Sequence, residues 1–516
     1  MSDFPCVENY FLYFFRTQYQ RSIFMKKYIL AIDSGTTSAR ALIFDKSGKE
    51  IGKAQYEFEQ FFPKEGWVEH DAIEIWSKQK LAIQKVLSST SISLMDIASI
   101  GITNQRETTV VWDKITGVPV YNAIVWQDRR TAKFCNELKI QGVEPMISEK
   151  TGLLLDPYFS GSKIRWILEN VPGLKSRASE GGLLFGTIDT WLIWQLTNGE
   201  KHITDSSNAS RTMLFDIHKN QWDDDLVKLL GIPKTMLPEI VSSSGFSAEA
   251  RLKEWEMAIP ICGIAGDQQA ALFGQLCFEA GDVKNTYGTG CFCMMNTGTK
   301  AVASKNKMLT TIAWEINGKI EYALEGSVFI GGALIQWLRD GLEIISETEE
   351  IEKLARSVED NGGITFISSL AGIGAPYWNP EAKGGLFGIT RGTKQGHIAR
   401  AALEAIAIRS TEIINEMQKD SGIQFSKLKV DGGASMNALL MQIQANLLST
   451  IVVRSKTKEI TALGIAFLAG LGCGFWENKE SLKSLWEKDK EFIPKSSEQN
   501  RKMLDLWNKR IEKILQ

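Results

Sequence analysis

The chain has 516 residues, too many for one ordinary core, and its length favours two or more domains. Hydrophobic residues make up 44% and charged residues 23%, the balance of a globular rather than a disordered protein. Lys and Arg number 59 against 61 Asp and Glu, and the net charge of −2 gives no broad basic surface, so we expect no nucleic acid and no anionic membrane as a partner.

The first 24 residues do not share the pattern of the rest of the chain. Tyr10–Phe15 is an aromatic and aliphatic burst, shorter than a signal-peptide core and without a basic segment before it. Regular patterning begins only after Met25. We therefore interpret residues 1–24 as an extension of unknown role outside the fold. Since no apolar run approaches the ~18 residues of a membrane span, we expect no membrane span and a cytoplasmic protein.

The first ordered elements are predicted to be strands and a helix in alternation. Tyr28–Ile32 and Ala41–Phe44 are short apolar runs on either side of the Gly/Ser/Thr turn Asp33–Ser38, which predicts a hairpin. Apolar residues at helical spacing over residues 73–87 predict an amphipathic helix, and Ile97–Thr103 reads as the next strand. This alternation is typical of an α/β architecture.

A comparable set of elements begins in the middle of the chain. Ile261–Gly266 is strand-like, and Val283–Thr286 and Cys291–Met295 flank a second Gly/Thr turn. Leu428–Gly433 is a further strand and turn, followed by a helical run over Asn437–Leu448. These parallels predict two related halves.

We expect two α/β domains that pack around a central cleft. The expected boundary makes residues 25–274 the N-terminal domain and residues 275–516 the C-terminal domain.

Cysteines and histidines give no sign of a metal site. The seven cysteines are scattered and the four histidines are isolated, so disulfides and His-centred catalysis are not expected. Buried apolar thiols in a reducing compartment are the better interpretation.

The turn after the first strand has the residues that phosphate binding requires. Asp33 at a strand end can orient Mg²⁺, Thr36 and Thr37 can donate to phosphate, and Arg40 adds a fixed positive charge. Alone, this octet also fits an ordinary turn. The sequence contains no Walker-type P-loop, and the first strand lacks a Rossmann fingerprint, which argues against a dehydrogenase.

Three further features fit phosphoryl transfer. The turn within Asn285–Gly290 repeats the Gly/Thr pattern in the second half, so that each half supplies one hairpin to a nucleotide. Asp431–Ala434 puts glycine where a base or ribose can lie, although a plain turn fits it as well. Asp267 follows an apolar strand and is either a general base or a helix cap.

A polyol needs a donor, an acceptor and an apolar wall. Arg106 and Glu107 offer donor and acceptor side by side at a strand end, and Trp126 and Tyr158 can supply the wall. Taken singly, such a pair is also typical of a surface ion pair, and such aromatics of a core.

These motifs together resemble the glycerol kinases of the FGGY carbohydrate kinase family, within the actin/hexokinase/heat-shock-ATPase superfold. The resemblance covers the chain from about Lys27 to its C-terminus. It is carried by Asp33–Arg40, Gly66–Asp71, Ile102–Thr108, Asn122–Gln127, Asp156–Gly161, Gly266–Ala270, Asn285–Gly290 and Val430–Gly433, and by two family signatures over Tyr158–Asn170 and Gly385–Glu404.

The resemblance implies that both domains are of the actin-like, ribonuclease H-like type around a central ATP and substrate cleft, with glycerol and phosphate binding in residues 25–274 and nucleotide binding in residues 275–516. It implies ATP-dependent phosphorylation of glycerol to sn-glycerol 3-phosphate, with ATP and Mg²⁺ as cofactors. It implies that Asp267 is the catalytic base and that Asp33 organises Mg²⁺. The implied glycerol-binding residues are Arg106, Glu107, Trp126, Tyr158, Asp267 and Gln268. The implied ATP-binding residues are Thr36, Thr37, Ser38, Arg40, Thr289, Gly332, Gln336, Gly433 and Asn437.

The sequence departs from the family pattern at two places. Ser34 stands where glutamine is common, and Ser242–Met257 lacks both the Gly-rich loop that binds fructose 1,6-bisphosphate and the histidine that is phosphorylated in other members. We expect a homo-oligomer, a dimer or tetramer, as in relatives. The alternatives are an FGGY kinase for a pentulose or another polyol, and a nucleotide-binding regulator without turnover.

Overall fold

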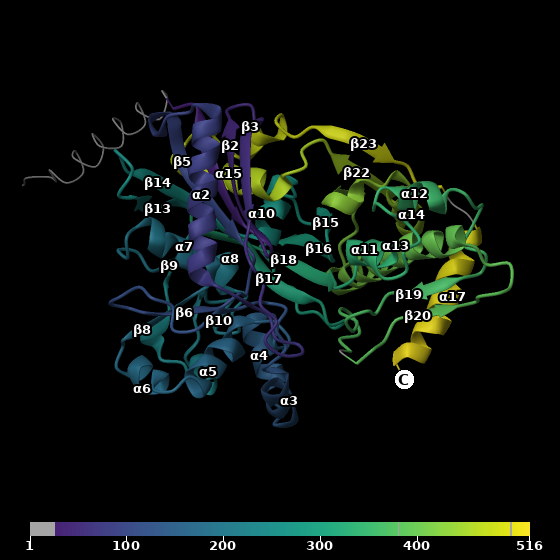
Figure 1. The fold of residues 1–516 in the computed structure, drawn as a ribbon, viewed down its shortest axis with the longest axis horizontal. Coiled ribbons are helices and arrows are strands. Elements are labelled where there is room, and N and C mark those ends of the chain that lie inside the picture. The colour runs from purple at the N-terminus through teal and green to yellow at the C-terminus, as the bar shows by residue number, and fades with distance from the viewer. Residues whose placement is uncertain (1–25, 380, 496–497, 516) are drawn as a thin grey trace, which may run out of the picture. The chain divides into compact units, whose positions relative to one another are not determined.

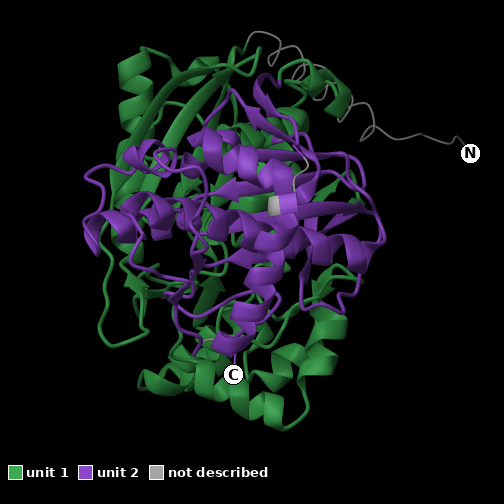
Figure 2. Cartoon of the chain, turned by 90° about the vertical axis from the view of Figure 1, so that its right-hand side faces the viewer, with its two compact units in different colours: residues 1–274, 314–320, 461–485 green, residues 275–313, 321–460, 486–516 purple. Residues whose placement is uncertain are grey.

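The computed structural model describes residues 26–379, 381–495 and 498–515, so the extension expected over residues 1–24 lies outside the described residues. The chain forms two compact units, coloured separately in Figure 2. Unit 1 consists of residues up to 274 together with 314–320 and 461–485. Unit 2 consists of residues 275–313 and 321–460 and those from 486 onwards. Each unit is built on a mixed β-sheet, which confirms the expected α/β class.

The central sheet of unit 1 has the strand order β3-β2-β1-β5-β14-β13. β1 (Tyr28–Ser34) pairs antiparallel with β2 (Ser38–Asp45), which pairs antiparallel with β3 (Glu50–Glu57). On its other side β1 pairs parallel with β5 (Ile97–Asn104), which pairs parallel with β14 (Ile259–Gly266). All residues of β5 are buried, as expected for a strand in the middle of a sheet covered on both faces.

Helices from distant parts of the sequence cover this sheet. α2 (Ala72–Thr90) packs against β2 and β3 (Figure 1), and its N-cap Asp71 accepts a hydrogen bond from the Ile73 amide. α15 (Ile460–Cys473) approaches β5 and β14 so closely that a Cβ at Gly101 would lie 2.6 Å from the Ile465 carbonyl oxygen. Small residues at this contact let the helix lie directly on the strands that carry the site.

Other elements of unit 1 surround this core. They are β4 (Glu69–His70), β6 (Val110–Asp113), β7 (Ala123–Ile124), α3 (Ala132–Ile140), α4 (Glu144–Thr151), α5 (Ser160–Asn170), α6 (Leu174–Ser179), β8 (Leu183–Gly186), α7 (Ile188–Leu196), β9 (Ile203–Asp205), α8 (Ser206–Ala209), β10 (Phe215–Asp216), β11 (Gln221–Trp222), α9 (Asp224–Leu229), β12 (Glu239–Val241), β13 (Ser244–Ala250), α10 (Asp267–Gly274) and α16 (Lys479–Lys483).

The sheet of unit 2 runs β23-β22-β21-β15-β16-β18-β17. β15 (Val283–Tyr287) pairs antiparallel with β16 (Cys291–Gly298) and parallel with β21 (Lys427–Asp431). The long helix α13 (Gln395–Ser421) packs against α14 (Ala438–Leu448), and their apolar faces share one core with the sheet. The remaining elements are β17 (Leu309–Ile316), β18 (Lys319–Val328), α11 (Gly332–Asp340), α12 (Glu350–Ala355), β19 (Thr365–Ile367), β20 (Gly385–Phe387), β22 (Ile451–Ser455), β23 (Lys488–Phe492) and α17 (Glu498–Leu515).

The sequence predictions for individual elements agree with the structure. Both predicted hairpins form, as β1–β2 and β15–β16, and the helix predicted over residues 437–448 is α14, with Asn437 as its N-cap. The six described cysteines are buried and free. Within the described part of the chain, every helix falls short of the length and apolarity that a membrane crossing demands.

Candidate active site

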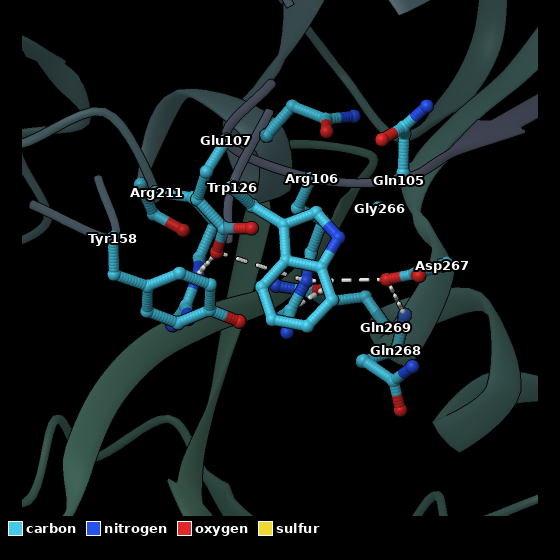
Figure 3. A network of polar contacts seen from close by, with 12 residues as sticks. Gln105, Arg106, Glu107, Trp126, Tyr158, Arg211, Gly266, Asp267, Gln268 and Gln269 are labelled. Carbon is cyan, nitrogen blue, oxygen red and sulfur yellow. Dashed lines mark hydrogen bonds and ion pairs between the residues drawn. The ribbon is translucent and has the colours of Figure 1, made fainter. Parts of the chain in front are cut away.

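The ends of two parallel strands bring the predicted catalytic and substrate residues together. Asn104 at the end of β5 is the register partner of Gly266 at the end of β14, so the residues that follow each strand are neighbours. The Arg106 Nε lies 3.2 Å from Asp267 Oδ1 and 3.9 Å from Glu107 Oε1. Arg106 and Glu107 are buried, whereas the Asp267 side chain is 28% exposed. Asp267 is therefore the accessible carboxylate of the group (Figure 3).

Glu107 is held in an unusual backbone conformation. Its φ of 62° lies in the left-handed region, which residues other than glycine rarely adopt. The hydroxyls of Ser160 and Thr109 donate to its carbonyl oxygen over 2.9 and 3.1 Å. The Nε of Arg211, which the sequence analysis did not single out, donates to Glu107 Oε1 over 2.7 Å. Backbone and side chain of Glu107 are thus both fixed.

Two aromatic rings lie beside these charges. The Trp126 and Tyr158 rings meet edge to face, with centroids 5.6 Å apart and planes at 65°. The Trp126 Nε1 donates to the Thr36 hydroxyl over 3.0 Å, which ties this aromatic pair to the first turn. Figure 3 draws both rings together with Arg106 and Glu107. Their role as an apolar wall stays a prediction.

A buried lysine supports Tyr158 from behind. The Lys163 Nζ, on α5, donates to the carbonyl oxygens of Pro157 and Tyr158 over 2.6 and 2.5 Å. Burial lowers the pKa of Lys163 to about 8. The two hydrogen bonds of the Lys163 Nζ fix the backbone that presents the Tyr158 ring.

The first residues of α10 complete the polar group. The Gln268 amide donates to Asp267 Oδ1 over 2.7 Å, and the Gln269 Oε1 accepts from Arg106 Nη1 over 3.2 Å. A carboxylate in the first turn of a helix is stabilised by the partial positive charge of that end. Asp267 is thus the first residue of α10 and also lies beside Arg106.

The predicted phosphate turn lies next to the same strand ends in unit 1. Asp33 and Arg40 face each other as register partners in β1 and β2, with Arg40 Nη1 3.7 Å from Asp33 Oδ2. The Gly35 amide donates to the Ser38 carbonyl oxygen over 3.0 Å and closes the turn, in which Thr37 is exposed. The Gln105 side chain donates to the Gly35 carbonyl oxygen over 3.0 Å and joins this turn to β5.

In unit 2 the second turn lies at the start of α11. The amides of Gly332 and Ala333 donate to the carbonyl oxygens of Gly288 and Thr289 over 2.8 and 3.0 Å. A Cβ at Gly332 would lie 2.8 Å from the Gly288 oxygen, closer than real Cβ atoms approach. The structure therefore brings Thr289 and Gly332 together, and Gln336 is exposed one turn further along α11.

The third turn packs against the second. Gly432 has a φ of 86°, and a Cβ there would lie 2.5 Å from the Tyr287 carbonyl oxygen. Its neighbour Gly433 is exposed, with no atom within 4 Å of the place of a Cβ. Asn437 caps α14 by accepting from the Leu440 amide over 2.9 Å. The five nucleotide-binding residues predicted in the second half thus come from one region of unit 2.

Among the described residues, no three His, Cys, Asp or Glu side chains are grouped as a metal cage would require. The role of Asp33 in binding Mg²⁺ stays a prediction.

Comparison with known proteins defines the class. Residues 28–274 match the N-terminal domain, and residues 283–473 the C-terminal domain, of the FGGY family of carbohydrate kinases. The chain belongs to this family.

Relatives and a solved structure narrow the comparison. The chain is 56% identical over 473 residues to the glycerol kinase of Burkholderia multivorans, which covers 92% of this chain and 95% of that protein. It is 54% identical over 490 residues to glycerol kinase 2 of Thermotoga maritima, covering 95% and 99%. The crystal structure of Plasmodium falciparum glycerol kinase with ADP superposes with a TM-score of 0.88 at 37% identity, covering 95% of this chain and 98% of that one.

The sequence analysis did not single out two supporting residues, Arg211 and Lys163. Arg211 lies in Asp205–Thr212, a run of mostly small polar residues. Such a composition suits a buried, hydrogen-bonded turn. Lys163 lies inside a family signature and is fully buried in α5, where a charged side chain indicates a specific partner.

Proposed function

We propose that this protein is a glycerol kinase, which transfers the γ-phosphoryl group of ATP to a terminal hydroxyl of glycerol and releases sn-glycerol 3-phosphate and ADP. One observation carries the proposal. The accessible Asp267 lies 3.2 Å from the buried Arg106, beside Glu107 and the Trp126–Tyr158 ring pair. This set would supply a donor, an acceptor, a base and an apolar wall. The chain also matches the glycerol kinases named above over nearly their whole length.

The substrate residues have distinct roles in this proposal. Arg106 donates to glycerol hydroxyl oxygens, Glu107 accepts from hydroxyl protons, and Gln268 and Tyr158 add polar contacts. Trp126 packs against the carbon chain. Since Arg106 and Glu107 are buried, a ligand hydroxyl that fails to pair with them would leave desolvated charges unsatisfied, which gives selectivity for a polyol.

Asp267 is the proposed general base. As the terminal hydroxyl oxygen bonds to the γ-phosphorus, the bond from that phosphorus to the bridging oxygen of ADP breaks, and the hydroxyl proton moves to the Asp267 carboxylate. The close contact with Arg106 orients this carboxylate.

The ATP-binding residues are assigned in each unit by itself. In unit 1, Thr36, Thr37, Ser38 and Arg40 would hold phosphate oxygens. In unit 2, Thr289 would also contact a phosphate, and the close-packed glycine turns leave exposed backbone at Gly433 for a base or ribose. Gly332, Gln336 and Asn437 would contact the rest of the nucleotide. Asp33 would hold Mg²⁺, which neutralises charge on the phosphates when bound.

Three further assignments are proposals of the same kind: an N-terminal domain over residues 25–274 and a C-terminal domain over residues 275–516, a cytoplasmic location, and a homo-oligomeric state.

An assay of ATP consumption with glycerol, dihydroxyacetone and xylulose tests the function. We expect the highest kcat/KM with glycerol. A preference for xylulose would identify a pentulose kinase instead, and ATP binding without phosphorylation of any polyol would identify a regulator.

A further inference from the structure

One short segment, residues 205–212, contacts the ends of β5 and β14 and the start of α5. It begins where Asp205 ends β9 and caps α8 by accepting from the amides of Ser207 and Asn208, each over 3.0 Å. The buried Ser243 hydroxyl also donates to Asp205, over 2.6 Å. A fully buried carboxylate with several donors holds this segment rigidly in place.

The segment then binds the two strand ends directly. The Ser207 hydroxyl accepts from the amide of Gly266, the residue before Asp267, over 3.0 Å. The Asn208 Oδ1 accepts from the Asn104 side chain over 3.1 Å, two residues before Arg106. These bonds fix the ends of β14 and β5 relative to each other.

The same segment also holds the aromatic side of the site. The Thr212 carbonyl oxygen accepts from the Gly161 amide over 2.8 Å, in the first turn of α5, which follows Tyr158. A Cβ at Gly161 would lie 2.9 Å from that oxygen, so the contact requires glycine. The segment is therefore a common support for the catalytic strands and the aromatic wall.

Arg211 is the residue of this segment that contacts the charged side chains of the candidate site. Its side chain is fully buried, its Nε lies 2.7 Å from Glu107 Oε1, and its guanidinium carbon lies 5.7 Å from the centroid of the Tyr158 ring. Figure 3 shows Arg211, Glu107, Arg106 and Asp267 as a continuous row of alternating charge. Two arginines balance two carboxylates in this row.

We infer that Arg211 is a positioning residue for substrate recognition, which acts by holding Glu107. This inference rests on the proposed function and deepens it. Without the Arg211 guanidinium the row carries one excess negative charge, and Glu107 competes with Asp267 for Arg106, whose Nε already lies within 3.9 Å of both. Glu107 and Arg106 then leave the places where a polyol meets them.

Kinetics of Arg211 variants with the full-length enzyme test this inference. We expect Arg211→Met to raise the KM for glycerol about 10- to 100-fold, the range for losing a hydrogen bond to a charged group. The KM for ATP should change less than twofold, and the change in kcat should be smaller than the change in the KM for glycerol. Arg211→Lys, which keeps the charge but not the Nε geometry, should lie between Arg211→Met and the wild type.

A double-mutant cycle separates positioning from a general structural role. If Arg211 acts through Glu107, the KM for glycerol of the Glu107→Gln variant should rise little further when Arg211→Met is added. The matched control is Arg409→Met, which removes a similarly buried arginine of unit 2 that pairs with Glu412. The control should lower the melting temperature and leave the KM for glycerol unchanged.

Three results would overturn the inference. They are a wild-type KM for glycerol in Arg211→Met, fully additive effects in the double mutant, and an equal rise in the control. Where Arg211→Met does not fold, a soluble Arg211→Lys enzyme with a wild-type KM decides against it in the same way. A wild-type chain that binds ATP and phosphorylates no glycerol overturns the proposed function as well, so the two failures are distinguishable.

Discussion

Replacing Asp267 by asparagine tests the proposed base with little change in geometry. The amide oxygen of asparagine can still accept from the Gln268 amide, as Asp267 Oδ1 does over 2.7 Å. Arg106 keeps its hydrogen bond to Gln269 over 3.2 Å and its contact with Glu107. The substitution therefore removes proton acceptance and one negative charge, and leaves the other proposed polyol-binding side chains in place.

The expected loss of activity exceeds the expected loss of stability. General-base catalysis contributes about 10²- to 10⁴-fold in kcat, or about 2.7–5.4 kcal/mol of activation free energy. A carboxylate in the first turn of a helix contributes about 0.3–1 kcal/mol to the free energy of unfolding. Exchanging a charged for a neutral acceptor at Arg106 costs about 1 kcal/mol more, reduced by solvent because the Asp267 side chain is 28% exposed.

The assay measures kcat and KM for glycerol with saturating ATP, together with the melting temperature. We expect Asp267→Asn to lower kcat at least about 100-fold, with a KM for glycerol near that of the wild type. Asp96→Asn is the matched control, because the Asp96 side chain is 32% exposed and lies 3.5 Å from Lys27. A kcat for Asp267→Asn within a few-fold of the wild type would refute the assignment.

Three further predictions concern other parts of the chain. Gly433→Ala should raise the KM for ATP with little change in melting temperature, since the added Cβ has open space. Gly432→Ala should lower the melting temperature, because its Cβ would lie 2.5 Å from the Tyr287 carbonyl oxygen. Equal effects of the two substitutions on the KM for ATP and on the melting temperature would contradict this prediction. Asp33→Asn should raise the Mg²⁺ concentration for half-maximal activity, measured by titration at fixed ATP, and an unchanged value would remove Asp33 from that role. Burial lowers the pKa of His202 to about 4, so the unfolded chain takes up a proton near pH 6.5 that the folded chain refuses. The free energy of unfolding should therefore fall as the pH drops from about 6.5 towards 4, by at most about 1.4 kcal/mol per pH unit for this group. When this free energy is measured by urea titration at both pH values, its fall should be smaller for His202→Gln than for the wild type.

The fold was predictable where strands are short, apolar and joined by glycine-rich turns. Both hairpins and the strand and helix around Gly433 follow from local patterns that burial reinforces. The return of α15 to the sheet of unit 1 was not predictable. This helix is apolar on all sides, so its periodicity identifies no partner face, and its contact with Gly101 depends on packing between distant segments.

The chemistry of the candidate site was more predictable than its support. Asp33 lies near the end of β1, and Arg106 and Asp267 follow β5 and β14; polar residues at the carboxyl ends of strands in an α/β sheet indicate a ligand site. Arg211 follows a four-residue helix in an irregular segment, and its contact with Glu107 spans 104 residues. No local spacing encodes such a contact, so only the three-dimensional structure reveals it.

The two units use one strand topology for different purposes. In unit 1 the order β3-β2-β1-β5-β14 is antiparallel twice and then parallel twice, and in unit 2 the order β18-β16-β15-β21-β22 repeats those directions. The predicted similarity of the halves thus has a structural counterpart that sequence comparison shows only weakly. After the parallel strand of this repeat, unit 1 has Arg106 and Glu107, whereas unit 2 has Gly432 and Gly433. Charged side chains at this position suit hydroxyl groups, and bare backbone suits a flat base, so the same scaffold is compatible with the proposed polyol site in unit 1 and the proposed nucleotide site in unit 2.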